Sequence, residues 1–195
     1  AREEPLAFQA IVRDDVRAAE VVEQFRALLR KQDPINTTVD LNAVCRTTAK
    51  LVEHEVTARR ARLVLRLDPD LRPVRGDPVQ LQQVLINLTL NAVDAASTST
   101  SDREAAISTA TNNGDVEVHV SDTGPGLSPD AQRRLFEPFF STKTHGLGMG
   151  LTIVRTIVER WAMEKELIGS SRKPGGNLQD QLTFLEEFDV GYLRR

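Results

Sequence analysis

Residues 77–96 constrain the fold more than any other segment of the sequence. Asp77 is a favoured helix-capping residue and Pro78 suits a first helical turn, so a helix is predicted to begin here. From there to about Ala96, apolar residues fall on one face: Leu81, Val84, Leu85, Leu88, Ala92 and Ala95. This face predicts an amphipathic helix that packs on a sheet or on other helices.

The other side of this helix carries Asn87, Asn91 and Asp94. Their spacings of four and three residues place them on a common face. An amide that faces a cleft is costly unless it has a partner, and an amide oxygen is a hard ligand suited to Mg²⁺. The helix alone leaves two interpretations open, a metal and phosphate site or a solvated polar stripe.

The rest of the chain alternates irregularly between short strands and helices. Strands are predicted at residues 37–41, 62–67, 106–111 and 116–120. Residues 112–115 are a hairpin turn signal between the last two strands. Further helices are predicted at residues 42–60, 129–135 and 151–163, and a last hairpin could pair residues 166–170 with 181–187. Because hairpins dominate, we expect an α+β fold with a mixed or antiparallel sheet.

Residues 1–32 are predicted to form one long helix, which ends before Pro34. Its seam repeats with spacings of three and four: Phe8, Ile11, Asp15, Ala18, Val22, Phe25 and Leu29. Val12, Val16 and Ala19 widen this stripe, which suits a helix bundle better than a two-stranded coil. An ordinary amphipathic helix is the alternative. Either way, we expect the stripe to pack against a second copy or against the rest of the chain.

Composition excludes several function classes. The net charge of −3 argues against broad nucleic-acid binding, which usually needs a basic excess. No apolar run approaches the roughly 18 residues needed to cross a membrane, so no membrane segment is expected in this chain. The single cysteine, Cys45, rules out an intrachain disulfide and a cysteine zinc site. Three scattered histidines, His54, His119 and His145, make a catalytic zinc site improbable.

Two glycine-bearing segments complete the candidate chemistry. Asp122 ends a predicted strand and is followed by Gly124 and Gly126, which let the backbone turn close to a ligand. Its carboxylate can accept a hydrogen bond from an exocyclic amine, or it can simply close an Asx turn. Glycines at alternate positions, Gly146, Gly148 and Gly150, lead into a helix whose free amides favour an anion. Lys143 supplies a cation nearby, although such a glycine pattern alone is weak evidence.

In order and spacing, these segments resemble the nucleotide-binding domain shared by gyrase, heat-shock chaperone, histidine kinase and MutL ATPases. Four boxes are similar: residues 83–95 resemble the N box, 122–126 the G1 box, 135–140 the F box and 146–151 the G2 box. Among the members of this superfamily, the chain is most similar to sensor histidine kinases of two-component systems. It resembles their short-lid type, which is found in nitrogen-regulation and oxygen-sensing kinases.

The resemblance implies a fold and three parts of the chain. The fold is a two-layer α/β sandwich whose mixed, largely antiparallel sheet is covered by three helices, at about residues 42–60, 78–96 and 151–163. Residues 1–33 would be the second helix of a dimerisation and histidine-phosphotransfer hairpin. Residues 34–188 would be the catalytic ATP-binding domain, and residues 189–195 a tail without a counterpart. The ligand is expected between the helix at 78–96 and the glycine loop.

The resemblance also implies roles for individual residues toward ATP and Mg²⁺. Asn91 matches the Mg²⁺ ligand, Asn87 lies one turn before it near the phosphates, and Asp122 matches the acceptor of the adenine amine. The other ATP-binding matches are Gly124 and Gly126 in the adenine pocket, Phe139 and Phe140 at the lid hinge, Lys143, Gly146, Gly148 and Gly150 in the lid, and Thr183 against adenine. No residue is assigned as a catalytic group.

Asn87 separates a kinase from a hydrolase. The ATP-hydrolysing relatives place a glutamate there as a general base, and asparagine cannot accept a proton at neutral pH. We therefore expect a protein-histidine kinase domain that donates the γ-phosphate of ATP to a histidine, for relay to the receiver domain of a response regulator. The implied assembly is a homodimer through residues 1–32. The expected location is cytoplasmic, either as a cytoplasmic protein or as the cytoplasmic part of a membrane-bound sensor.

Several departures from the family pattern keep an alternative open. Many members carry a basic residue at position 90 or 94, where this chain has Leu90 and Asp94. The segment after Trp161 and the final hairpin also differ from the family. The acceptor histidine motif is missing, so we read the chain as a fragment that starts after the first hairpin helix. The alternative is a degenerate module that binds nucleotide and dimerises without transferring phosphate.

Overall fold

The computed structural model describes residues 37–100, 102–112, 115–143 and 146–167. These residues belong to one compact unit, Pro34–Arg195, and the other unit, Ala1–Asp33, lies outside them. Several predicted parts of the chain therefore lie outside the described residues. They are the long helix at 1–32, most of the last hairpin including Thr183, and the tail at 189–195.

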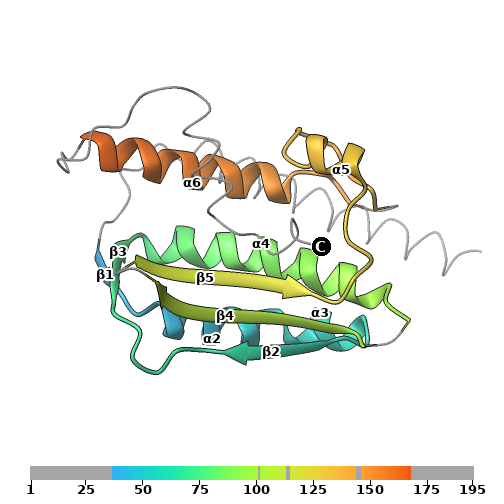
Figure 1. Ribbon diagram of the computed structural model, residues 1–195, viewed down its shortest axis with the longest axis horizontal. Helices are drawn as coiled ribbons and strands as arrows, with labels where there is room; N and C mark the ends of the chain where they lie inside the picture. The colour runs from blue at the N-terminus through green and yellow to red at the C-terminus, as the bar shows by residue number, and fades with distance from the viewer. Residues whose placement is uncertain (1–36, 101, 113–114, 144–145, 168–195) are drawn as a thin grey trace, which may run out of the picture. The chain divides into compact units, whose positions relative to one another are not determined.

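A three-stranded sheet forms the centre of this unit (Figure 1). Its strands are β2 (Arg62–Arg66), β4 (Glu104–Asn112) and β5 (Asp115–Asp122), in the order β2-β4-β5. β2 runs parallel to β4, whereas β4 and β5 pair antiparallel from Ala105 opposite Asp122 to Asn112 opposite Asp115. A smaller antiparallel sheet joins β1 (Thr37–Val39) to β3 (Val74–Gly76). The predicted mixed sheet and α+β fold are confirmed.

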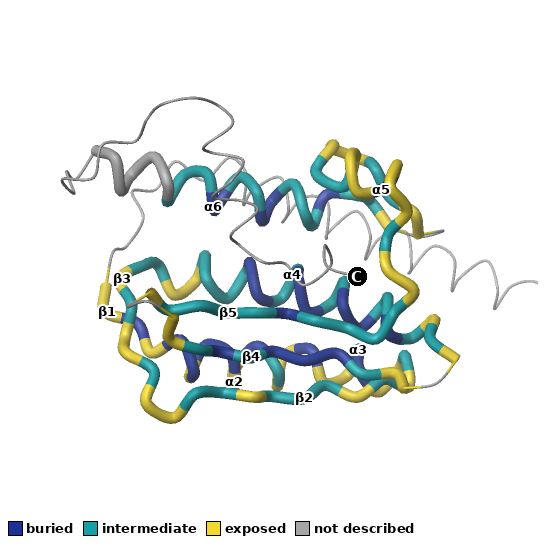
Figure 2. The backbone as a smooth tube through the Cα atoms, viewed as in Figure 1, coloured by how far each residue is buried: buried dark blue, intermediate teal, exposed yellow. Residues whose placement is uncertain are grey.

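Five helices accompany the sheets in the described residues. They are α2 (Leu41–Leu51), α3 (Glu53–Ala58), α4 (Pro78–Ser97), α5 (Pro129–Arg134) and α6 (Gly150–Leu167). α4 packs against β4, β5, α2 and α6, and so lies at the centre of the helical part. The largest fully buried side chains come from this junction and include Val93, Ile107, Val120, Ile153 and Val158. Figure 2 shows the buried positions running along β4 and the inner side of α4.

The start of α4 is as predicted. Asp77 has an extended backbone, and its carboxylate accepts a hydrogen bond from the Val79 amide at 2.8 Å. Pro78 occupies the first turn, where its missing N–H costs no hydrogen bond. The helix ends one residue later than predicted, at Ser97.

Several element boundaries differ from the sequence prediction, and β3 was not predicted. The strand predicted through Leu41 stops at Val39, because Asp40 caps a new helix by accepting from the Ala43 amide at 3.0 Å. The helix predicted over residues 42–60 is divided at Val52, which leaves helical geometry with φ −91° and ψ 1°. Glu166, predicted as a possible strand start, lies in α6.

Candidate functional site

The polar face of α4 meets the first residue of α6. A Cβ atom added to Gly150 would lie 3.1 Å from Asn87 Oδ1 and 3.9 Å from Asn91 Nδ2. The N-terminus of α6 therefore lies directly against the two asparagines that the sequence singled out. The Asn87 side chain is held in turn, because its Nδ2 donates to the Gln83 carbonyl oxygen at 2.9 Å.

Lys143 reaches the same face of α4 from the loop before α6. Its Nζ donates to Asn91 Oδ1 at 2.7 Å and forms an ion pair with Asp94. The Lys143 side chain is 38% exposed and that of Asp94 is 26% exposed, so this is a partly solvated arrangement. The structure thus brings together Asn87, Asn91, Lys143 and Gly150, four of the candidate ATP-binding residues.

Asp94 has a second cationic partner that sequence reasoning missed. Arg59, at the C-terminal cap of α3, pairs with Asp94 and with Glu55. Burial alone would lower the pKa of Arg59, but its hydrogen bonds to Glu55 and Asp94 outweigh that effect and raise the pKa. The sequence comparison with the family pattern singled out Asp94, but nothing in the sequence indicated that Arg59, at the end of α3, would pair with it.

The turn that follows β5 approaches α4 at Ala95, about one helical turn beyond Asn91. The Gly124 amide donates to Asp122 Oδ1 at 2.7 Å, which is an Asx turn. A Cβ on Gly124 would lie 2.8 Å from the Ala95 backbone, so only glycine fits this approach. A carboxylate has two acceptor oxygens, and an Asx turn occupies one of them. The turn and the predicted acceptor role are therefore compatible.

The loop between α5 and α6 doubles back on itself. Phe139 adopts a left-handed backbone with φ 65°, and the residue is 69% exposed. Gly148 also has a positive φ of 66°, and a Cβ there would collide with the carbonyl group of Phe140. The Arg134 guanidinium lies over the Phe140 ring, with its Cζ 4.3 Å from the ring centroid. The predicted hinge residues Phe139 and Phe140 thus lie against the glycine segment.

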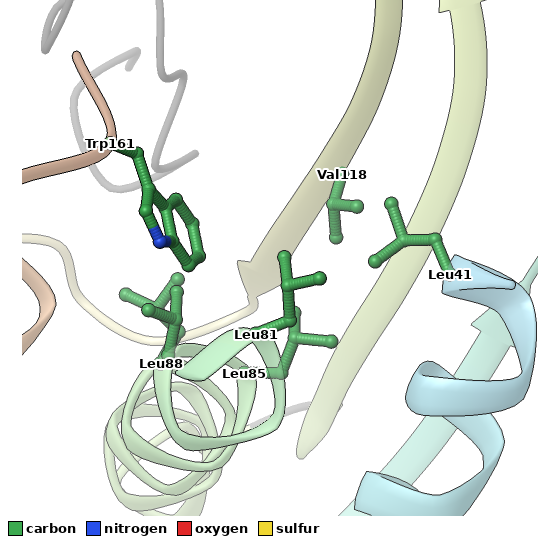
Figure 3. A pocket seen from close by; sticks show the side chains of 7 residues that line it. Leu41, Leu81, Leu85, Leu88, Val118 and Trp161 are labelled. Atoms are coloured by element: carbon green, nitrogen blue, oxygen red, sulfur yellow. The ribbon is translucent and has the colours of Figure 1, made fainter. Parts of the chain in front are cut away.

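A separate apolar cavity lies away from these residues (Figure 3). Its volume is about 30 Å³, and it is lined by Leu41, Leu81, Val84, Leu85, Leu88, Val118 and Trp161. This volume would hold about one or two water molecules, and the lining offers no polar partner for them. The Trp161 indole donates away from it to Gln80 Oε1 at 3.1 Å. None of the predicted site residues lines this cavity, and it is too small for a nucleotide.

Asn91 Oδ1 accepts a hydrogen bond from the cationic ammonium of Lys143, so this oxygen is oriented to ligate a cation. An amide oxygen and phosphate oxygens together suit Mg²⁺, which is usually bound with few protein ligands. A denser metal site is absent, since the described residues contain no group of three or more histidines, cysteines, aspartates or glutamates that could hold a metal ion. The residues present fit an Mg²⁺ site that a nucleotide would complete.

Comparison with known protein families gives one matching family model. Residues 76–184 match the model of histidine kinase-, DNA gyrase B- and HSP90-like ATPases. The sensor histidine kinase TmoS of Ectopseudomonas mendocina is 36% identical over 156 residues, covering 78% of this chain and 16% of TmoS. The sensor histidine kinase ZraS of Klebsiella oxytoca is 36% identical over 153 residues, covering 77% of this chain and 32% of ZraS. The chain thus spans a third or less of the length of these relatives.

Solved structures show the same similarity. Full-length ShkA in complex with AMPPNP matches with a TM-score of 0.59 and 27% identity, covering 71% of this chain and 29% of ShkA. The catalytic domain of the histidine kinase ThkA matches with a TM-score of 0.56 and 31% identity, covering 66% of this chain and 82% of that domain. ThkA in complex with the response regulator protein TrrA matches with a TM-score of 0.62 and 25% identity, covering 77% of this chain and 42% of that one.

Among the described helices, none has the length and apolar character to span a membrane.

Proposed function

Because the chain belongs to the family of histidine kinase-, DNA gyrase B- and HSP90-like ATPases and carries the ATP-binding catalytic domain of sensor histidine kinases, we propose that it works as a phosphate donor. In this proposal it binds Mg²⁺–ATP between α4 and the glycine loop. It donates the γ-phosphate to a histidine on a dimerisation helix, from which the phosphate passes to a response regulator.

The observation that carries this proposal is the meeting of Asn91, Lys143 and Gly150. An amide oxygen of α4 meets there a lysine ammonium and the start of α6, which lie about 50 residues further along the chain. A triphosphate with its metal needs these groups: an oxygen ligand, a cation and backbone amides at a helix N-terminus. Asn91 would hold Mg²⁺, which neutralises charge on the phosphates during transfer. Asp122 would select adenine by accepting a hydrogen bond from its exocyclic amine.

Asn87 favours transfer over hydrolysis. Its Oδ1 lies next to the start of α6, where the phosphates are expected, and its Nδ2 is bonded to a carbonyl of α4. An amide cannot take a proton from water at neutral pH, so the site has no general base at this position. A kinase that phosphorylates histidine needs no such base, because a nitrogen of the neutral imidazole can attack the γ-phosphate with its own lone pair.

The partners follow from the same proposal. ThkA was solved with a response regulator, and we propose a receiver domain as the partner of the whole protein to which this chain belongs.

Residues 1–32 are proposed to join two copies, and the short segment between Phe140 and Gly150 is proposed to serve as a short lid. Because the donor is ATP, we propose a cytoplasmic location for this domain.

Titration of the chain with AMPPNP, with and without Mg²⁺, tests the binding half of the proposal. We expect binding that depends on Mg²⁺ and that Asn91→Ala weakens at least tenfold, since the metal loses its protein ligand. Asn112→Ala is the matched control, because Asn112 is an exposed amide bonded to Glu117 at the far end of the β4–β5 hairpin. Binding of equal strength without Mg²⁺, or in Asn91→Ala, would contradict the assignment.

The second half of the test supplies a separate hairpin that carries an acceptor histidine. Labelled phosphate should move from ATP to that histidine when this chain is added. A chain that binds Mg²⁺–AMPPNP but transfers no phosphate to any tested hairpin would instead be a regulatory nucleotide-binding module.

A further inference from the structure

The lysine of the glycine loop lies on the oxygen that the proposed function assigns to the metal. Lys143 Nζ donates to Asn91 Oδ1 at 2.7 Å. Asp94, one turn further along α4, forms an ion pair with the same ammonium. A cation of this chain therefore contacts the oxygen atom that the proposed function assigns to Mg²⁺.

Asp94 is itself fixed by a second ion pair. Arg59 contacts both Asp94 and Glu55, so a row of alternating charges runs from Glu55 through Arg59 and Asp94 to Lys143. We call this row the α3–α4 charge row. Its four members come from α3 and its C-terminal cap, from α4 and from the loop before α6. Asp94 thus stays in place whether or not Lys143 is bound to it.

Mg²⁺ and the Lys143 ammonium would repel each other if both lay against Asn91 Oδ1, because two cations a few ångströms apart interact unfavourably. The Asp94 carboxylate also opposes the approach of a triphosphate to this face of α4, since both are negative. Lys143 must therefore leave Asn91 before a metal–nucleotide complex occupies the site, and Asp94 resists that departure.

We propose that Asp94 is a positioning residue that docks Lys143 on the metal ligand and thereby lowers the affinity for Mg²⁺–nucleotide. This inference rests on the proposed function. It gives Asp94 a physical role, in which it holds Lys143 against Asn91 until a metal–nucleotide complex displaces the ammonium. The expected effects are modest, because the ion pair is partly exposed and solvent weakens it.

The first test needs no nucleotide. Trypsin cleaves after lysine only when the side chain enters its specificity pocket, so cleavage after Lys143 reports whether the ammonium is free. Asp94→Asn should raise the rate of cleavage after Lys143 by about two- to fivefold in the nucleotide-free protein. Glu55→Gln is the matched control, because it removes one negative charge from the same row without touching Lys143. It should leave the cleavage rate unchanged.

The second test measures affinity for Mg²⁺–AMPPNP. Asp94→Asn should tighten binding by about two- to fivefold, and Glu55→Gln should not change it. Weaker or unchanged binding in Asp94→Asn, an unchanged cleavage rate, or equal shifts in both variants would overturn the proposal. Equal shifts would show an effect of net charge alone.

Two further controls keep the tests decisive. If Asp94→Asn unfolds because Arg59 loses its partner, the double variant Arg59→Gln/Asp94→Asn removes both charges, with Arg59→Gln as its reference. A wild-type chain that binds no nucleotide would contradict the proposed function. The trypsin measurement would then still decide whether Asp94 holds Lys143.

Discussion

At the scale of single residues, Asp122 shows how one carboxylate can serve both the fold and a ligand. It ends β5, accepts the Gly124 amide and so shapes the approach of this turn to α4. Asparagine can also close an Asx turn, so Asp122→Asn should preserve the local fold. Any loss of nucleotide affinity in that variant can therefore be assigned to the carboxylate itself.

The first prediction concerns that variant. A hydrogen bond to a charged group contributes about 1.5–3 kcal/mol, so Asp122→Asn should lower the affinity for adenine nucleotides at least tenfold. Calorimetric titration with ATP and GTP checks this, and the wild-type chain should bind GTP poorly. Asp115→Asn, at the exposed opposite end of β5, is the control. Equal affinity of the wild-type chain for ATP and GTP would remove Asp122 from its assigned role.

Cys45 provides a second prediction, on pH dependence. Cys45 is a buried residue of α2, and this burial raises the pKa of its thiol to about 11 from an ordinary value of 9.0. The unfolded chain therefore releases this proton at lower pH than the folded one, so its contribution to stability is complete below pH 9 and falls between pH 9 and 11. The maximum loss is about 2–3 kcal/mol.

Urea unfolding of the wild-type chain and of Cys45→Ala, at several pH values from 8 to 11, measures this loss. Other groups that titrate in this range are common to both proteins, so the difference between their slopes isolates Cys45. The wild-type chain should lose stability more steeply above pH 9. Parallel slopes would show that the thiol does not titrate differently in the folded state.

At the scale of elements, the loops before and after α5 each contain a glycine with a left-handed backbone, Gly126 before it and Gly148 after it. Gly126 and Gly148 both have positive φ values, of 74° and 66°. Nothing lies within 4 Å of a Cβ on Gly126, whereas a Cβ on Gly148 would collide with the Phe139–Phe140 backbone. This pair separates the cost of the backbone conformation from the cost of a steric clash.

The third prediction follows from this pair. Gly126→Ala should destabilise the fold by about 1–2 kcal/mol, the cost of a left-handed residue with a Cβ. Gly148→Ala should cost about 1–3 kcal/mol more, because overpacking is added to the same conformational cost. Denaturant unfolding of both variants measures the difference. A smaller effect for Gly148→Ala would mean that this loop yields to the added methyl group without loss.

The elements that were predicted best are those with several independent local signals. α4 has a capping aspartate, a proline at the first turn and a long apolar periodicity, and its bounds were predicted to within one residue. β3 has three residues, too few for a periodic pattern, and it was missed. The break at Val52 carries neither glycine nor proline, so nothing in the local sequence marked it.

The candidate site was predictable as a set of motifs but not as a set of contacts. The proximity of Gly150 to Asn87 and Asn91 agrees with the arrangement expected from the motifs. The pairing of Asp94 with both Lys143 and Arg59 depends on where α3 and the loop lie in three dimensions. Charged residues far apart in a sequence have many possible partners, and local patterns do not choose among them.

At the scale of the whole molecule, the described histidines are poorly suited to accept phosphate. His54 is exposed on α3, and His119 lies within β5, where its Nε2 is 3.1 Å from Glu117 Oε2. His145 lies outside the described residues, in the segment proposed as the lid. Phosphate transfer requires an imidazole nitrogen in line with the γ-phosphate at near-attack distance. We infer that the acceptor must come from a separate helix.

The last prediction follows from this inference. The isolated chain should bind Mg²⁺–ATP without accumulating acid-labile phosphohistidine, because neither of the two described histidines, His54 and His119, is placed for in-line attack. A hairpin carrying an acceptor histidine should restore transfer, and Asn91→Ala should abolish it through loss of the metal ligand, while Asn112→Ala should not. Incubation with γ-labelled ATP, followed by acid and base treatment of the separated chains, distinguishes these outcomes. Label at His54, His119 or His145 of the isolated chain would show that the acceptor lies within this chain, and that the separation of donor domain and acceptor helix is wrong.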